Sequence, residues 1–252
     1  MRGETPVLHG DGVRHFELAA TLWHKERLLN LLLASLPERF TKIVWLDADV
    51  LFEDPAWAPK TSALLDRCAV VQCFDQAVHL SRGAHEPRAD DLVLDGYVAM
   101  ARHPGAVHGE TGFAWAIRRD ALGVEGWYDR AILGGGDHLM AHVFAGAATS
   151  HPCIMNLIGT AASAASFASW RAQIRTRLLD RPDSVPGTLF HLWHGERAMR
   201  RYRERLEILT RHGFDPDTDI AAARNGTWMW SSDKPALHAE VARYFEERAE
   251  DG

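Results

Sequence analysis

Two aspartates separated by one small residue, Asp47 and Asp49, are the side chains whose types and spacing first suggest chemistry. They follow the apolar run Ile43–Leu46, whose β-branched and aromatic residues are typical of a buried strand. Residues two apart in an extended chain point to the same side, so both carboxylates are expected to face one spot. Neighbouring acids repel each other unless a cation lies between them, and Mg²⁺ or Mn²⁺ is the usual cation. A solvated turn without a ligand is the alternative.

A pair of histidines near the C-terminal third is the second candidate group. His191 lies in the strand-like segment Leu189–Trp193, and His194 and Gly195 follow it directly. Imidazole is a common metal ligand. Residues three apart on a straight strand face opposite ways, so both histidines bind one ion only if the chain turns there. The alternative is one core histidine and one surface histidine.

A glycine-rich turn carries the third candidate. Gly134–Gly136 permit backbone conformations and close approaches that side chains forbid, and Asp137 follows them at the start of an expected helix, His138–Gly146. Asp137 is placed to act as a general base or, alternatively, only to cap that helix.

The elements expected around these residues alternate between strand and helix. The segment His15–Ala20 reads as a strand, Thr21–Leu36 as a helix ended by Pro37, and Ile43–Leu46 as the next strand. This order predicts a parallel α/β sheet, in which ligands bind beyond the carboxyl ends of the strands. Further along, we expect strands at 69–73, 112–117 and 189–193 and a long loop at 75–91. Helices are expected at 61–67, from residue 170 onward, in a segment that ends near residue 211, and at 235–247.

Bulk composition excludes several classes of protein. The chain has 252 residues, of which 46% are hydrophobic and 25% charged, as in an ordinary globular domain. Its net charge of −6 argues against an extended nucleic-acid interface. Three scattered cysteines make neither a disulfide framework nor an obvious zinc site. No apolar run reaches transmembrane length and no signal-peptide core is seen, so we expect a cytoplasmic location.

Taken in order, these motifs resemble a metal-dependent glycosyltransferase of the GT-A fold, in particular the β-1,4-galactosyltransferase group and bacterial family 2-like enzymes. Arg27–Asn30 (RLLN) resembles the K-L-L-N of that group, and Asp47–Asp49 resembles its D-V-D. Gly112–Leu122 loosely resembles its G-G-V-S-A-L-S-K segment. Gly135–Asp137 resembles the G-G-E-D turn that holds the catalytic base, and His191–His194 resembles the Met/His-x-x-His segment that supplies metal ligands. Each motif is short, but all five occur in the same order.

The resemblance implies a fold and a domain organisation. The expected architecture is a GT-A, Rossmann-like, mostly parallel sheet flanked by helices, in one domain over residues 1–252 with 196–252 as a helical extension. Family members begin with a strand–helix unit that holds the nucleotide base, and almost nothing precedes His15 here. We therefore expect an N-terminally shortened form, in which a partner or a second copy could complete that side.

The resemblance also implies the chemistry of the site. The donor would be a UDP-sugar, with galactose or a relative as the sugar, and Mn²⁺ or Mg²⁺ would neutralise the departing diphosphate. Asp49 is the expected direct ligand, followed by His194 and then His191, while Asp47 reaches the ribose or a metal-bound water. Asp137 would take the proton of the acceptor hydroxyl, with inversion at the sugar.

Other residues are assigned to the donor and the acceptor. Arg27, Asn30 and Arg197 are expected to contact the donor. Acceptor binding, to a glycan, a lipid or a small molecule, is assigned to Trp115, Trp127, Tyr128, Gly135 and Gly136. Burial in the core is the commoner fate of such aromatic residues.

Two other functions stay open on the sequence. A nucleotidyltransferase or nucleotide-sugar hydrolase would also use paired acids and Mg²⁺, although no glycine-rich, lysine-containing phosphate loop occurs near the N-terminus. A non-catalytic, shortened domain that binds a glycan or a partner chain is the other alternative.

Overall fold

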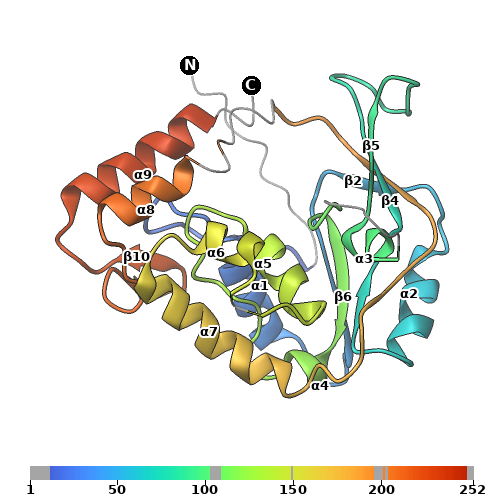
Figure 1. The fold of residues 1–252 in the computed structure, drawn as a ribbon, viewed down its shortest axis with the longest axis horizontal. Helices are drawn as coiled ribbons and strands as arrows, with labels where there is room; N and C mark the ends of the chain where they lie inside the picture. The colour runs from blue at the N-terminus through green and yellow to red at the C-terminus, as the bar shows by residue number, and fades with distance from the viewer. Residues whose placement is uncertain (1–11, 103–108, 149, 196–200, 202–203, 249–252) are drawn as a thin grey trace.

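The computed structural model describes residues 12–102, 109–148, 150–195, 201 and 204–248 (Figure 1). Its strands are β1 Lys42–Leu46, β2 Val50–Phe52, β3 Val70–Gln72, β4 Gln76–His79, β5 Leu92–Asp95, β6 Ala114–Arg118, β7 Asp183–Ser184, β8 Thr188–His191, β9 Ile220–Ala222 and β10 Trp228–Trp230. Its helices are α1 Lys25–Ser35, α2 Trp57–Leu65, α3 Tyr97–Met100, α4 Arg119–Leu122, α5 Gly136–Phe144, α6 Pro152–Ile158, α7 Ala161–Arg175, α8 Arg205–Arg211 and α9 Pro235–Arg248.

Two mixed four-stranded sheets organise the molecule. The first has the order β1-β6-β3-β7, in which β6 runs antiparallel to both of its neighbours and only β3 and β7 are parallel. The second has the order β2-β8-β4-β5, in which only β4 and β8 are parallel. The prediction of a mostly parallel, Rossmann-like GT-A sheet is therefore wrong.

The strand order explains why that prediction failed. His15–Ala20 forms no strand, and Leu18 in it is 48% exposed, so α1 does not cross over between two parallel strands. β1 and β3 do run in the same direction, but β6 lies between them and pairs with both. Because β6 comes later in the chain, the local sequence around β1 and β3 does not reveal it.

The central strand of the first sheet divides the core into two layers. Side chains alternate between the faces of a strand, so Trp115 and Ile117 of β6 point to one face and Ala114 and Ala116 to the other. The tryptophan face packs against α5, α6 and α7, and the alanine face packs against α2 (Figure 1). The small alanines allow α2 to approach the sheet closely.

Most of the other predicted elements are confirmed with shifted ends, and two differ in kind. The 75–91 segment is not a continuous loop, because β4 lies within it and pairs with β5 in a hairpin. β1 is an edge strand whose Val44 and Leu46 are 39% and 42% exposed, so it is buried on one face only.

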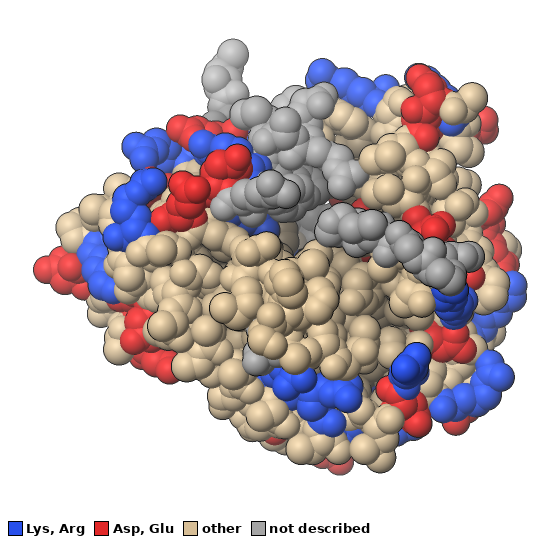
Figure 2. Space-filling model, viewed as in Figure 1, with Lys and Arg blue, Asp and Glu red and all other residues tan. Residues whose placement is uncertain are grey.

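The chain after β8 forms a second, smaller core. In its described part, α8, the β9–β10 hairpin and α9 bury Leu237, Val241 and Tyr244 against Leu22 and Ile132 from the rest of the chain. Figure 2 shows the face over α5–α7, whose middle is mostly uncharged and whose edges mix acidic and basic side chains. None of the helices in the described ranges has the length and hydrophobicity needed to cross a membrane.

Candidate functional site

The two aspartates of the D-x-D motif lie where the chain passes from one sheet to the other. Asp47 N donates to Phe113 O at 2.8 Å, which extends the β1–β6 pairing by one residue. Leu192 N donates to Asp49 O at 2.8 Å, which extends the β2–β8 pairing in the same way. Because each aspartate belongs to a different sheet, their carboxylates meet different neighbours.

Asp49, His191 and His194 form a group that we call the ligand triad. The β2–β8 register pairs Val50 with His191, which places Asp49 beside the end of β8. Asp49 Oδ2 lies 3.0 Å from His194 Nε2 and 3.5 Å from His191 Nε2, and the two Nε2 atoms are 3.1 Å apart. The chain leaves the strand after His191, so both imidazoles reach the same carboxylate.

The ligand triad fits a divalent cation. One oxygen and two nitrogen ligand atoms lie within 4.8 Å of one another. Asp49 Oδ1 is buried and has no hydrogen-bond partner among the described residues, which is costly unless a ligand satisfies it. A mixed carboxylate and imidazole set suits Mn²⁺ or a later first-row ion better than Mg²⁺, which prefers oxygen ligands.

Electrostatics keep Asp49 ionised. Burial opposes its charge, but the hydrogen bond from His191 and the electrostatic attraction of His191 and His194 outweigh burial and lower the pKa of Asp49 below its ordinary value. An ionised carboxylate is the form that binds a metal.

Asp47 belongs to a second group, the acid–lysine cluster, formed by Lys25, Glu26, Asp47 and Asp137. Lys25 Nζ forms an ion pair with Asp47 and lies 4.0 Å from Asp137 Oδ2. Burial opposes the charge of Lys25, but Asp47, Asp137 and Glu26 together raise its pKa above the ordinary value. Burial also raises the pKa of Asp47, and Lys25 only partly offsets it. The structure thus places Asp47 on a lysine and outside the ligand triad.

Glu26 is the most buried acid of this cluster, with 3% of its surface exposed. Burial, supported by the nearby charges of Asp137 and Asp47 and opposed by Lys25, raises its pKa to about 7. Its carboxyl group lies against the first turn of α5, where a Cβ added to Gly136 would come within 2.6 Å of Glu26 Oε1. Gly136 therefore has no side chain because a buried acid fills that space.

Asp137 lies inside the first turn of α5, and Gly135, with φ of 91°, holds the N-cap position. Asp137 Oδ1 accepts a hydrogen bond of 2.8 Å from His138 N. Asp137 Oδ2 faces Gly112: a Cβ added there would lie 3.1 Å from it and 3.7 Å from Glu110 Oε1. Gly112 thus leaves open the space between the carboxylates of Asp137 and Glu110.

Glu110, whose carboxylate lies across the open position at Gly112 from Asp137, is linked by contacts to the ligand triad. Glu110 Oε2 lies 3.3 Å from His79 Nε2, and the His79 ring lies 5.0 Å from that of His191, its partner in the β4–β8 register. Phe113 stacks on His191 at 4.4 Å and has a φ of 74°. A positive φ is costly for a bulky residue, and such strain is concentrated at functional sites.

Several members of this site were missed by sequence reasoning. Lys25 and Glu26 stand at the start of an amphipathic helix, where charged residues are ordinary, and no motif marked them. His79 lay in a segment expected to be a loop. Only their contacts with the D-x-D aspartates, the glycine turn and the histidines reveal them.

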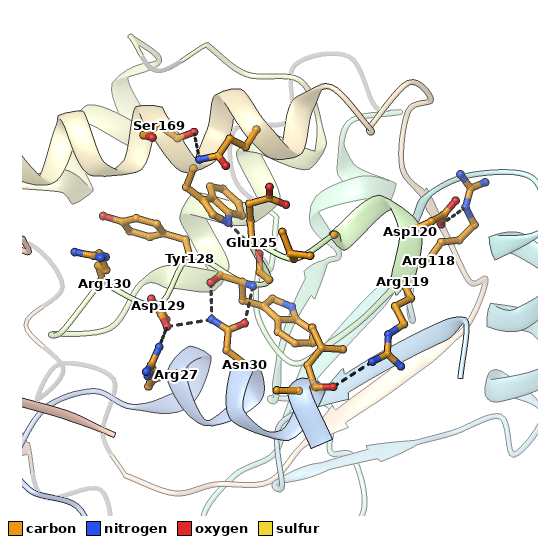
Figure 3. Close-up of a pocket in the computed structure, with 18 of the residues that line it drawn as sticks. Arg27, Asn30, Arg118, Arg119, Asp120, Glu125, Tyr128, Asp129, Arg130 and Ser169 are labelled. Carbon is orange, nitrogen blue, oxygen red and sulfur yellow. Dashed lines mark hydrogen bonds and ion pairs between the residues drawn. The ribbon is translucent and has the colours of Figure 1, made fainter. Parts of the chain in front are cut away.

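Two residues assigned to the donor, Arg27 and Asn30, lie elsewhere. They project from α1 into a cavity of about 1330 Å³ that includes neither a member of the ligand triad nor Asp137. Both contact Asp129 Oδ2, Arg27 at 3.2 Å and Asn30 at 3.0 Å (Figure 3). Asn30 also exchanges two hydrogen bonds of 2.9 Å with the backbone of Trp127. In this position they hold α1 against the 126–129 segment, and their role as donor ligands stays a prediction.

The aromatic residues assigned to the acceptor lie in the core. Trp115 and Trp127 are each 2% exposed and Tyr128 is 5% exposed, and their rings pack against neighbouring aromatic side chains. Stacking on a sugar would require them to leave these contacts. Gly136 does lie against Glu26 of the acid–lysine cluster, whereas Gly135 faces Arg205 and Leu157. Arg197 falls outside the described residues.

Comparisons with protein-family models, with curated proteins and with solved structures give no match for this chain. The residues of the site are therefore the basis for proposing a function.

Proposed function

We propose that the protein is a divalent-cation-dependent glycosyltransferase that uses a nucleoside-diphosphate sugar, with a UDP-sugar as the first candidate. The observation that carries the proposal is the ligand triad, one ionised carboxylate and two imidazoles with ligand atoms within 4.8 Å, beside a cluster of further acids. The order of the short motifs, which resembles that of β-1,4-galactosyltransferases, supports the sugar-transfer reaction.

The chemistry divides between the two groups. A bound cation would neutralise the negative charge that grows on the departing diphosphate. Asp49, His191 and His194 would hold that cation. Asp137 would accept the proton of the attacking hydroxyl, because its Oδ2 faces the open position at Gly112. Lys25 keeps Asp47 and Asp137 in place and compensates their charge.

Nucleotide-sugar hydrolysis is the second candidate. It would use the same cation, and Glu110 beside His79 is a second acid that could activate water instead of an acceptor hydroxyl. The acceptor, a glycan, a lipid or a small molecule, distinguishes the two reactions. A cytoplasmic location is part of the proposal and is supported by three free cysteines.

The experiment is a screen of UDP-sugars and GDP-sugars for release of free nucleoside diphosphate, with Mn²⁺ and with EDTA. We expect release from one donor that needs Mn²⁺ and rises with a suitable acceptor. Release that is independent of any acceptor would favour the hydrolase. Asp49→Asn should abolish release, whereas Asp54→Asn, an acid paired with Lys60 outside the site, should not. Release unaffected by EDTA and by Asp49→Asn would contradict the proposal.

A further inference from the structure

A second group of metal-ligating side chains lies between α5 and α6, outside the ligand triad. His138 and His142 are one turn apart on α5, so they face the same side of that helix. The adjacent helix α6 brings Cys153, its second residue, to the same place (Figure 1). The ligand atoms of these three residues all lie within 4.8 Å of one another. In a tetrahedral zinc site the ligand atoms are roughly 3.5 Å apart, so only a small closure is needed.

The hydrogen bonds of the histidines fix the ring orientation and tautomer that metal binding requires. His142 Nδ1 lies 2.9 Å from His138 O, and a carbonyl can only accept, so Nδ1 carries the proton and the lone pair is on Nε2. Metal-bound imidazoles are commonly fixed in this way, by donating the other ring N–H to a backbone carbonyl. His138 Nδ1 contacts Thr111 Oγ1 at 3.3 Å. The neighbouring His151 accepts through Nδ1 from Cys153 N at 3.3 Å and caps α6.

The donor set selects the kind of metal. A thiolate with two imidazoles favours Zn²⁺ over Mg²⁺ or Mn²⁺, whereas the ligand triad has a carboxylate in place of the thiolate. Cys153 is a free, half-buried thiol, and the other two cysteines lie buried in a different part of the core. His142 is buried, with 4% of its surface exposed, whereas His138 and Cys153 are half-buried.

We propose that His138, His142 and Cys153 bind one Zn²⁺ ion that joins α5 to α6. This site is distinct from the proposed catalytic cation and does not depend on the glycosyltransferase assignment. His138 directly follows Asp137, so the zinc ion would also fix the first turn of α5 and the position of the Asp137 carboxylate. Its role is to stabilise this part of the fold and to position Asp137.

The test is a titration of the EDTA-treated protein with Co²⁺, which reports a thiolate ligand through a sulfur-to-cobalt charge-transfer band. We expect the band to appear in the unaltered protein, to saturate at one Co²⁺ per chain in Asp49→Asn, where the ligand triad is weakened, and to disappear when Zn²⁺ is added. Cys153→Ser should remove the band and weaken Zn²⁺ binding at least ~100-fold. Two controls, Cys68→Ser and Asp49→Asn, should keep the band, because they change a thiol and a metal ligand elsewhere.

The proposal would be overturned by the absence of a thiolate–cobalt band in the unaltered protein, or by a band of full strength in Cys153→Ser. The first result does not depend on whether any variant folds. His142→Ala gives a further check, because it keeps the thiol but removes a ligand. Unchanged Zn²⁺ affinity in that variant, with a native circular dichroism spectrum, would also reject the site. Loss of sugar-nucleotide activity in the Asp49→Asn control would not affect this outcome.

Discussion

Asp47 and Asp49 have the same side chain and lie two positions apart, yet their surroundings give them different properties. Asp49 meets two imidazoles and its pKa is lowered, whereas Asp47 meets Lys25 and burial raises its pKa. The sequence predicted that a cation would compensate these acids. The structure supplies a lysine for Asp47 and leaves Asp49 with the geometry of a metal ligand. Lys25 could not be inferred from the motif because it lies on the preceding helix α1, and only the packing of that helix brings Lys25 to Asp47.

Asp137→Asn tests the general base at the residue scale. Asparagine can accept the hydrogen bond from His138 N as aspartate does, but it cannot take up a proton. We expect kcat to fall by at least ~10² with little change in donor KM or in Tm. Initial rates over a range of donor and acceptor concentrations would measure this. Glu110→Gln is the matched variant, and a larger loss in it than in Asp137→Asn would move the base to Glu110.

Glu26→Gln tests the buried acid. The pKa of Glu26 is raised from 4.5 to about 7 in the folded protein, so between these values the unfolded chain has lost a proton that the folded chain keeps. Stability should therefore fall as pH rises through this window and stay level above it. The neutral glutamine should remove this fall and stabilise the protein by about 3 kcal/mol above pH 7.

Urea unfolding at pH 4.5, 6 and 8 would measure that effect. The exposed Glu38→Gln is the control and should change stability little at any pH. A Glu26→Gln variant whose stability follows that of the unaltered protein at all three pH values would show that Glu26 is ionised throughout.

At the scale of elements, the sequence predicted individual helices and strands, because these depend on residues that are close together in the chain. The apolar run of β1, the periodicity of α7 and the glycine turn before α5 all identified their elements. The long-range pairing of β6 between β1 and β3, and of β8 between β2 and β4, was not predictable in the same way. Those pairings turn the expected parallel sheet into two mixed sheets. They also bring His191 next to Asp49. The motif resemblance had assigned both residues to one metal site, although the sheet predicted from it was wrong.

Asn30→Ala tests the contact between α1 and the 126–129 segment. The Asn30 side chain makes hydrogen bonds with Trp127 O, Trp127 N and Asp129 Oδ2. Their loss leaves buried backbone groups unsatisfied, so we expect about 2–3 kcal/mol of destabilisation with UDP affinity changed less than ~2-fold. Chemical denaturation and calorimetry would measure the two effects, with the exposed Gln173→Ala as control. A large loss of UDP affinity at unchanged stability would instead make Asn30 a donor ligand.

At the scale of the whole molecule, the two sheets meet where the candidate chemistry lies. The chain crosses from the first sheet to the second between Asp47 and Asp49, and the strained Phe113 packs on His191 at this crossing. Asp137 on α5 lies in the same region, and the proposed zinc site lies between α5 and α6. The ligand triad lies at the β2–β8 end of the second sheet, and Asp47 lies at the end of β1 in the first sheet, so the two groups are neighbours only when both sheets are formed.

Calorimetric titration of the EDTA-treated protein with Mn²⁺, alone and with UDP, tests whether the ligand triad binds the cation that holds the diphosphate. We predict that the unaltered protein binds Mn²⁺ and that UDP strengthens this binding. Asp49→Asn and His194→Ala should each lower the Mn²⁺ affinity at least ~10-fold while keeping a native circular dichroism spectrum. Asp54→Asn and Cys153→Ser should leave it unchanged, because neither residue belongs to the ligand triad. Equal Mn²⁺ affinity in the unaltered protein, Asp49→Asn and His194→Ala would show that the ligand triad does not bind the cation.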